Sequence, residues 1–271
     1  MIAGSLLARV RSLFRDAAAS GVAMSLYVAN DPSSGVGEAG FLRALVACAI
    51  QLQRDVAPAW GRLAPTIVPI KHGDPIPQST TDGPVAVLSV VGKIPDDPTA
   101  QGWHQALGSG QPFDGYVSTE GVDADGFSEV LSHELIETLV DPGTDRIAVA
   151  PNGDQHPIEA CDMVQARNDS ERVPISLVNA DGSTTTEYLS NFVFPSAFGL
   201  ATPPGAPQPE GKYDFLGALS APFTRAPGGY EAITHADGTT EDVFGEARTM
   251  LSPRALHADS RVQVRKAKAA A

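Results

Sequence analysis

The sequence predicts an α+β fold in which a twisted mixed sheet packs against a backing helix and a second helix that lies beneath the sheet. Apolar residues recur at helical spacing in two long segments, 38–56 and 127–140. Short β-branched segments separated by turn-forming residues lie between these two helices. The chain has 271 residues, of which 42% are hydrophobic, so it can bury one large core.

The N-terminal half is expected to alternate helices and strands. Residues 6–14 form a short amphipathic helix with arginines on its polar side, which docks on the surface of the fold. In residues 38–56 the apolar side chains share one helical face, Pro58 ends the run, and Cys48 is a buried thiol. The strands expected in this half are residues 22–29, 66–70, 85–91 and, at an edge of the sheet, 113–118.

The C-terminal half is expected to contain hairpins. Segments 173–178 and 185–189 flank Asn-Ala-Asp-Gly at 179–182, and these turn residues tolerate the positive φ that a hairpin needs. A second turn of this kind is His-Ala-Asp-Gly at 235–238.

The domain organisation follows from a proline-rich segment and from the C-terminal composition. Residues 201–211 contain four prolines, which favours a surface loop and offers a place for a subdomain break. The last residues combine basic residues with alanine and lack a bulky apolar core. We therefore predict a single domain over residues 1–252 and a flexible tail over residues 253–271.

Charge and hydropathy exclude several classes of partner. The net charge of −13 and the pI near 4.8 argue against nucleic acid, which needs clustered Lys and Arg. No apolar run approaches the ~20 residues that a membrane-spanning helix needs. Residues 1–20 also lack the apolar core of a secretory signal. We expect a cytoplasmic protein with no membrane partner, while non-classical export and the oligomeric state stay open.

The second helix contains the sequence His-Glu-Leu-Ile-Glu at 133–137. His133 and Glu137 are four residues apart and project from one helix face, with about 5–6 Å between Cβ atoms, which suits two ligands of one metal ion. Glu134 points partly aside, where the general base of a metal hydrolase must lie. The layout is that of HExxH with glutamate in place of the second histidine.

A third metal ligand is expected from the sequence downstream of this helix. A catalytic zinc ion takes three protein ligands and leaves one position open. Asp162 is the first choice, Glu159 the second, and His156 a third candidate. Cys161 binds zinc well in principle, but the carboxylates beside it outnumber it.

Zinc is the first choice of ion, although a carboxylate-rich donor set lets Mn²⁺ or Ca²⁺ compete better than they do at a histidine site. Between residues 120 and 162 eleven Asp and Glu residues face a single basic residue, Arg146. Carboxylates that share a site repel one another, and a divalent ion removes that repulsion. The sequence therefore predicts stability that depends on metal.

The motif region resembles a known group of proteins. The pattern His-Glu-Leu-Ile-Glu, then Asp141-Pro142, then Glu-Ala-Cys-Asp at 159–162 is similar to the zincin-like HExxE pattern of uncharacterised bacterial proteins and, distantly, of the plant EXORDIUM-like (phosphate-induced) proteins. The resemblance covers about residues 128–164. Segments 190–195 and 213–217 also look like bacterial members of this group.

This resemblance implies a zincin-like fold with His133, Glu137 and Asp162 as metal ligands and Glu134 as the catalytic base. The chain departs from the plant members in two respects. It shows no secretory signal, and its cysteine, Cys161, precedes the aspartate instead of following it.

The function expected from these residues is that of a metal-dependent hydrolase, first of all a zinc peptidase, whose peptide or protein substrate lies along an edge strand. Two alternatives stay open. The first is a non-catalytic zincin-like protein whose metal is structural and which acts as a binding or structural module. The second is a metal-free module with an acidic helix face.

Other polar residues are weaker candidates. His104, expected in a loop, is either an oxyanion stabiliser or an ordinary loop histidine. Asn191 and Tyr188 are candidates to line the cleft. Asp141 lies at a helix C-terminus, where the helix dipole disfavours a carboxylate, so it either holds a ligand histidine or starts a turn. Trp60 is expected in the core.

Overall fold

The computed structural model of the protein describes residues 23–75, 83–95, 97, 101–106, 113–122, 126–179 and 181–245. The helix expected at residues 6–14 and the tail expected at residues 253–271 lie outside these residues.

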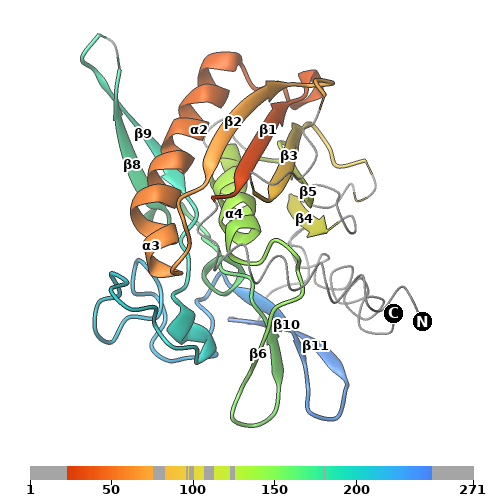
Figure 1. The fold of residues 1–271 in the computed structure, drawn as a ribbon, viewed down its shortest axis with the longest axis vertical. Helices are drawn as coiled ribbons and strands as arrows, with labels where there is room; N and C mark the ends of the chain where they lie inside the picture. The colour runs from red at the N-terminus through yellow and green to blue at the C-terminus, as the bar shows by residue number, and fades with distance from the viewer. Residues whose placement is uncertain are drawn as a thin grey trace.

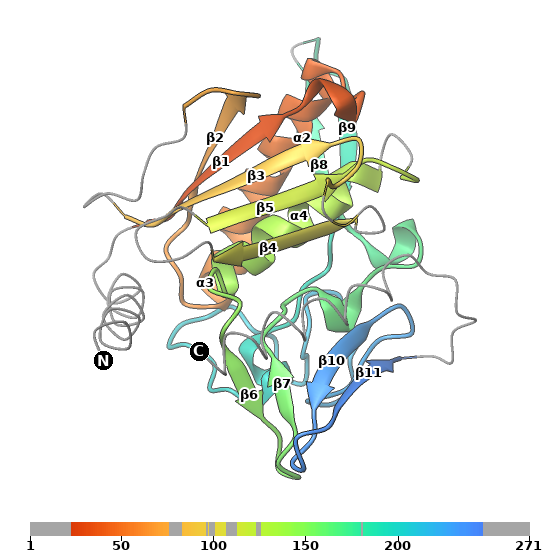
Figure 2. The same ribbon diagram turned by 90° about the vertical axis from the view of Figure 1, so that its right-hand side faces the viewer.

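A five-stranded mixed sheet forms one layer of the fold, and its twist is plain in Figure 2. The strand order is β2-β1-β3-β5-β4, with the first four strands parallel and β4 antiparallel to β5. The central strand β3 is almost continuously apolar and is buried along nearly its whole length. The strands are β1 (Ser25–Asn30), β2 (Thr66–Lys71), β3 (Val85–Val91), β4 (Gly102–Ala106) and β5 (Phe113–Ser118).

Two helices lie against the same face of this sheet and against each other (Figure 1). The backing helix α2 (Glu38–Gln51) runs through a π-helical turn (Leu52–Val56) into α3 (Ala57–Ala59). Helix α4 (Gly126–Val140) packs on β3, β4 and β5. The hairpin of β8 (Val173–Val178) and β9 (Thr184–Leu189) covers the other side of both helices.

Helix α4 is consequently enclosed, and all of its side chains are buried. A helix that is buried on every side is usually apolar all round. This one nevertheless carries Glu129, His133, Glu134 and Glu137, and a buried charged group is costly unless it is paired or binds an ion. The polar residues of α4 therefore have to be satisfied inside the protein.

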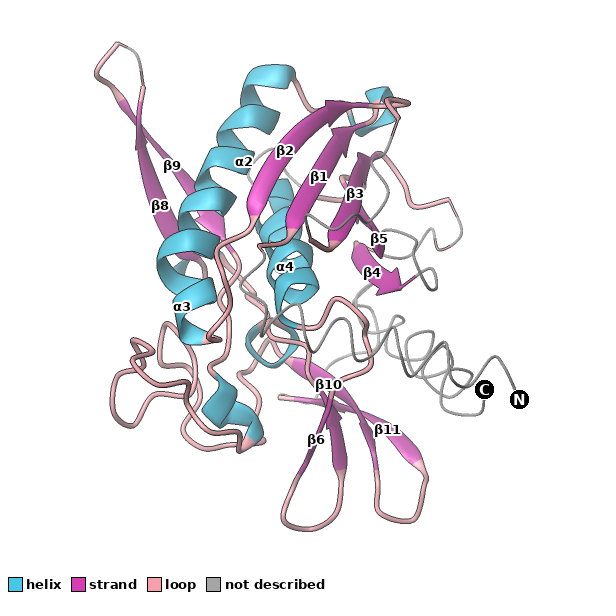
Figure 3. Cartoon of the chain, viewed as in Figure 1, coloured by secondary structure: helices cyan, strands magenta, loops and turns pink. Residues whose placement is uncertain are grey.

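A second, smaller sheet lies at the end of the molecule opposite the free end of the β8–β9 hairpin (Figure 3). Its four antiparallel strands are in the order β11-β10-β7-β6. They are β6 (Ile147–Val149), β7 (Gln155–Pro157), β10 (Tyr230–Thr234) and β11 (Thr240–Phe244). Short 3₁₀ turns complete the fold at Pro32–Ser34, Asp162–Val164, Asp169–Glu171 and Pro195–Phe198.

Most elements expected from the local pattern are present. The helix at 38–56 and the two hairpins are confirmed, and Gly182 and Gly238 have φ of +82° and +84° in the hairpin turns. Trp60 is buried, as expected, and donates from Nε1 to the carbonyl of Val193 at 3.0 Å. Cys48 is a fully buried free thiol.

Two expectations about the sheet are wrong. Residues 113–118 do not form an edge strand, because β5 pairs with β3 on one side and β4 on the other. The edge is β4, which contains His104 and was expected to be a loop. The residues of β4, Gly-Trp-His-Gln-Ala, are too few to show an alternating apolar pattern, so the sequence does not reveal this strand. Pairing with β5 makes it regular.

One hydrophobic core connects the sheet, both helices and the C-terminal segments up to Ala226. Residues 201–211 are irregular and mostly exposed. Among the described residues, none of the helices combines the length and the apolar composition needed to cross a bilayer.

Candidate metal centre

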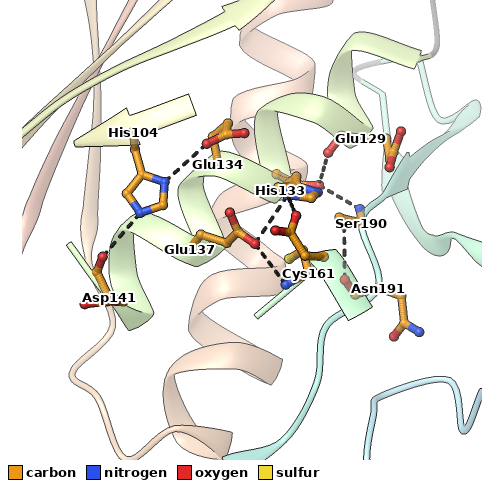
Figure 4. A network of polar contacts seen from close by, with 11 residues as sticks. His104, Glu129, His133, Glu134, Glu137, Asp141, Cys161, Ser190 and Asn191 are labelled. Atoms are coloured by element: carbon orange, nitrogen blue, oxygen red, sulfur yellow. Dashed lines mark hydrogen bonds and ion pairs between the residues drawn. The ribbon is translucent and has the colours of Figure 1, made fainter. Parts of the chain in front are cut away.

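His133, Glu137 and Asp162 meet inside the protein. Figure 4 shows the contact between His133 and Glu137 on α4. The first two lie one turn apart on α4, and Asp162 begins the 3₁₀ turn that follows β7. His133 Nε2 lies 3.1 Å from Asp162 Oδ1 and 3.3 Å from Glu137 Oε1. The potential ligand atoms of all three residues lie within 4.8 Å of one another, and all three side chains are buried.

These separations fit the chemistry of a divalent ion. Zinc binds imidazole nitrogen and carboxylate oxygen at about 2.0–2.2 Å, so two ligand atoms of a tetrahedral site lie about 3.3–3.6 Å apart. The distances of 3.1 and 3.3 Å are close to that range, and they are also those of a hydrogen bond and an ion pair. One imidazole nitrogen that faces two carboxylate oxygens is therefore a suitable donor set for a metal ion.

The chain around Asp162 is held in place by backbone contacts. The Ala226 amide donates to the Met163 carbonyl at 2.9 Å, and the Val193 amide donates to the Ala160 carbonyl at 2.8 Å. Gly229 permits this close approach, because a Cβ atom there would lie 1.9 Å from the Met163 carbonyl oxygen. Asp162 therefore stands on a well-supported turn.

Glu137 is oriented by the same segment. Its Oε1 accepts a hydrogen bond from the Cys161 amide at 3.2 Å, so the backbone fixes the oxygen that faces His133. Cys161 itself is a buried free thiol whose pKa is raised well above its usual value by burial and by the charge of Glu137. Cys161 therefore contributes to the site through its backbone amide.

Glu134 points toward the edge of the sheet. Its Oε2 lies 3.3 Å from Nδ1 of His104 on β4, and both side chains are buried. Gly102, also on β4, permits this contact, since a Cβ atom there would lie 2.5 Å from Glu134 Oε1. The edge strand thus holds the carboxylate that the sequence nominates as the base.

A second group of possible ligands lies beside the first. One donor atom each from His104, Glu137 and Glu159 lie within 4.8 Å of one another, and all three residues are buried. Glu137 therefore belongs to both groups. Glu159 is predicted from the sequence only as an alternative third ligand, and no sequence pattern connects His104 with Glu137.

The electrostatics of the cluster show how closely these groups interact. Burial alone would lower the pKa of His133, but the charge of Glu137 and the contact with Asp162 outweigh burial and raise that pKa well above its usual value. Burial raises the pKa of Glu137 to about 7, with His133 opposing the shift and Asp162 and Glu159 adding to it. Protons and a metal ion would compete for these side chains.

Asp141 takes part through its backbone. Its carbonyl oxygen lies 3.2 Å from His104 Nε2, whereas its carboxylate accepts from the amides of Asp145 and Arg146 at 3.4 and 3.0 Å. The carboxylate thus supports the turn after α4, and the carbonyl contacts the histidine.

Other polar side chains on and near α4, including the Glu129 carboxylate one turn before His133, have partners outside the two groups of possible ligands. Glu129 lies 3.6 Å from Arg172, and Ser132 accepts from the Ser190 amide at 2.7 Å. Asn191 donates to Asp214 at 2.8 Å and accepts from nearby backbone amides, so it organises a loop. Tyr188 is half-buried on β9.

His156, the remaining candidate ligand, lies on β7 in a separate cluster. Its Nδ1 is 3.0 Å from Glu231 Oε1, and its ring packs 4.8 Å from the ring of Phe223. Neither group of possible ligands found among the described residues includes His156 or Cys161.

Comparison of the chain with protein-family models, with curated proteins and with solved structures gave no match.

Proposed function

We propose that the protein is a metal-dependent hydrolase of zincin-like architecture, with peptides as its first substrate class and zinc as its first-choice ion. The observation that carries the proposal is the convergence of His133, Glu137 and Asp162 at ligand spacing, with Glu134 adjacent on the same helix. Mn²⁺ and Ca²⁺ are the alternative ions, because two of the three ligands are carboxylates.

The proposed division of labour follows from the positions of the side chains. A divalent ion at this site would act as a Lewis acid that polarises a carbonyl and makes water more acidic. Glu134 accepts the proton from water and passes it to the leaving amine, while His104 positions the Glu134 carboxylate at 3.3 Å. The edge strand β4 offers backbone groups to which an extended peptide can add.

One observation favours a second candidate, a metal-binding protein without catalysis. The side chains of His133, Glu134 and Asp162 are only 6, 3 and 4% exposed. A structural metal site is closed, whereas a catalytic one keeps a position open to substrate. The peptidase proposal therefore requires that the site open when substrate binds.

Glu134→Gln separates the two candidates. The hydrolase proposal expects zinc-loaded wild type to cleave peptides from a mixed library, and the variant to keep its zinc while its rate falls roughly 10²–10⁴-fold. His133→Ala is the matched control that should lose both zinc and cleavage. A zinc-loaded wild type that cleaves nothing would contradict the hydrolase proposal, and a Glu134→Gln variant with full activity would exclude Glu134 as the base.

A further inference from the structure

We infer that His104, Glu137 and Glu159 hold a second divalent ion, so that the Glu137 carboxylate bridges a two-metal centre. The inference rests on the proposed metal centre, because Glu137 is common to both sites. It goes beyond that proposal in assigning a second ion and a ligand role to His104 and Glu159.

The donor set of the second group suits a divalent ion. His104, Glu137 and Glu159 come from β4, from α4 and from the segment before the 162–164 turn, and their donor atoms converge to within 4.8 Å. One imidazole and two carboxylates match the composition of the His133 group. All three side chains are buried, unlike the exposed acidic groups that commonly gather without an ion.

The second step is the tautomer of His104. The Asp141 carbonyl oxygen can only accept a hydrogen bond, so Nε2, which lies 3.2 Å away, must carry a hydrogen. In a neutral ring Nδ1 then has a lone pair, and that lone pair faces Glu134 Oε2 at 3.3 Å. Two acceptors at that distance need a proton or a cation between them.

Two arrangements meet this requirement: a protonated His104 that donates from Nδ1 to Glu134, or a neutral His104 that binds a metal ion through Nδ1. A histidine ligand normally donates its other ring N–H to a carbonyl or carboxylate, which fixes the ring and its tautomer. The contact between His104 and Asp141 has this arrangement. Glu134 Oε2 lies 3.3 Å from Nδ1, so Glu134 borders the second site without belonging to its group of ligands.

The third step is the position of Glu137 between the two groups. Its Oε1 faces His133 and the Cys161 amide, and the Glu137 carboxylate is also a member of the His104 group, so one carboxylate contributes to both groups. Bridged pairs of divalent ions lie about 3.5–4 Å apart. Two divalent ions would also balance the four carboxylates of the cluster, Glu134, Glu137, Glu159 and Asp162, with both imidazoles neutral.

The test combines metal stoichiometry with magnetic coupling in the full chain. After chelation and reloading with Zn²⁺, native mass spectrometry should find two ions in wild type and one in both His104→Ala and Glu159→Gln. With Mn²⁺, electron paramagnetic resonance of wild type should show an exchange-coupled pair, and either variant should give the signal of an isolated ion. His156→Ala, which changes a buried histidine of the other cluster, is the matched control and should keep two ions.

The alternative results are distinct from one another. One Zn²⁺ in wild type that survives His104→Ala and is lost in His133→Ala would overturn the second site and leave the proposed function standing. No Zn²⁺ in wild type would overturn both. Two ions without magnetic coupling, or two ions that persist in both variants, would also contradict the bridge. The wild-type spectra decide the matter even where a variant does not fold.

Discussion

Two buried histidine clusters of this protein differ in the ratio of acidic to basic groups. At the second sheet, one carboxylate, Glu231, lies between two bases, 3.0 Å from His156 and 2.8 Å from Arg225. On α4, one nitrogen of His133 faces two carboxylates, Glu137 and Asp162, and the charge of Glu159 acts on Glu137 as well. The buried histidine of the second sheet therefore shares its carboxylate with a second base, whereas the buried histidine on α4 is shared by two carboxylates at the spacing of metal ligands.

The comparison assigns different roles to the two clusters. The His156 cluster joins β7 to β10 and contains its own counter-charge, so we expect it to stabilise the fold without an ion. The cluster on α4 carries an excess of acidic groups, so we expect its stability to depend on what it binds.

The largest effect is expected from Glu137→Gln, because this residue belongs to both groups of ligands. We expect zinc affinity to fall at least about 100-fold, since the change removes a ligand charge where even supporting residues are worth roughly 10–100-fold. Competition with a calibrated zinc chelator measures this affinity. Unchanged affinity would mean that zinc, if bound, lies elsewhere.

Chelation should lower the melting temperature of wild type. Ligand at 100 times its Kd stabilises a protein by about 2.7 kcal/mol, which corresponds to roughly 5–10 °C for a domain of this size. Scanning fluorimetry with and without Zn²⁺ measures the shift, with His133→Ala as the variant that should not respond. Equal shifts in the two proteins would indicate zinc binding outside the cluster.

The effect of zinc should grow with pH. Burial raises the pKa of Glu137 from 4.5 to about 7, so the proton that it holds in the folded apoprotein stabilises the fold below about pH 4.5, and this contribution is lost as pH rises through about 7. The raised pKa of His133 acts in the same direction. Chelated protein should lose on the order of 1–3 kcal/mol between pH 5 and 8, and zinc should restore it. Melting curves of chelated protein that rise over this range would contradict the assignment.

Glu231→Gln should lower stability and leave the metal content unchanged. The substitution removes the charge shared by His156 and Arg225, at a cost of about 2–3 kcal/mol. Urea unfolding measures the loss, and elemental analysis checks the metal. A fall in zinc content without global unfolding would show that the two clusters are coupled, and it would contradict their separate roles.

The smallest effect on stability is expected from Gly102→Ala. The added Cβ would lie 2.5 Å from Glu134 Oε1, so the carboxylate must move away from its place beside His104. We expect zinc content to stay the same while kcat of any hydrolase activity falls. The Gly121→Ala control, at a glycine with nothing within 4 Å but a φ of +72°, should cost only its backbone strain.

Local sequence patterns were sufficient to predict the elements whose signals lie within a few neighbouring residues. The helix at 38–56 has apolar residues at helical spacing, and the hairpin turns carry Asn, Asp and Gly at the right places. Strand β4 could not be found in this way, because its five residues, Gly-Trp-His-Gln-Ala, are too few to show an alternating pattern and become regular only through pairing with β5.

The same limit applies to the candidate site. The spacing of His133 and Glu137 on one helix is a local property, so the sequence suffices to pair them. Which downstream residue joins them depends on the turn at 162–164, which brings Asp162 to His133 and Glu159 toward His104. The sequence treated these two carboxylates as alternatives for one position, whereas the structure assigns them to different groups.

Anomalous diffraction from crystals soaked in Zn²⁺ would test the central claim most directly. The account predicts a peak at about 2.0–2.2 Å from His133 Nε2, Glu137 Oε1 and Asp162 Oδ1. A zinc peak at His156 instead, or no peak inside the protein, would contradict it.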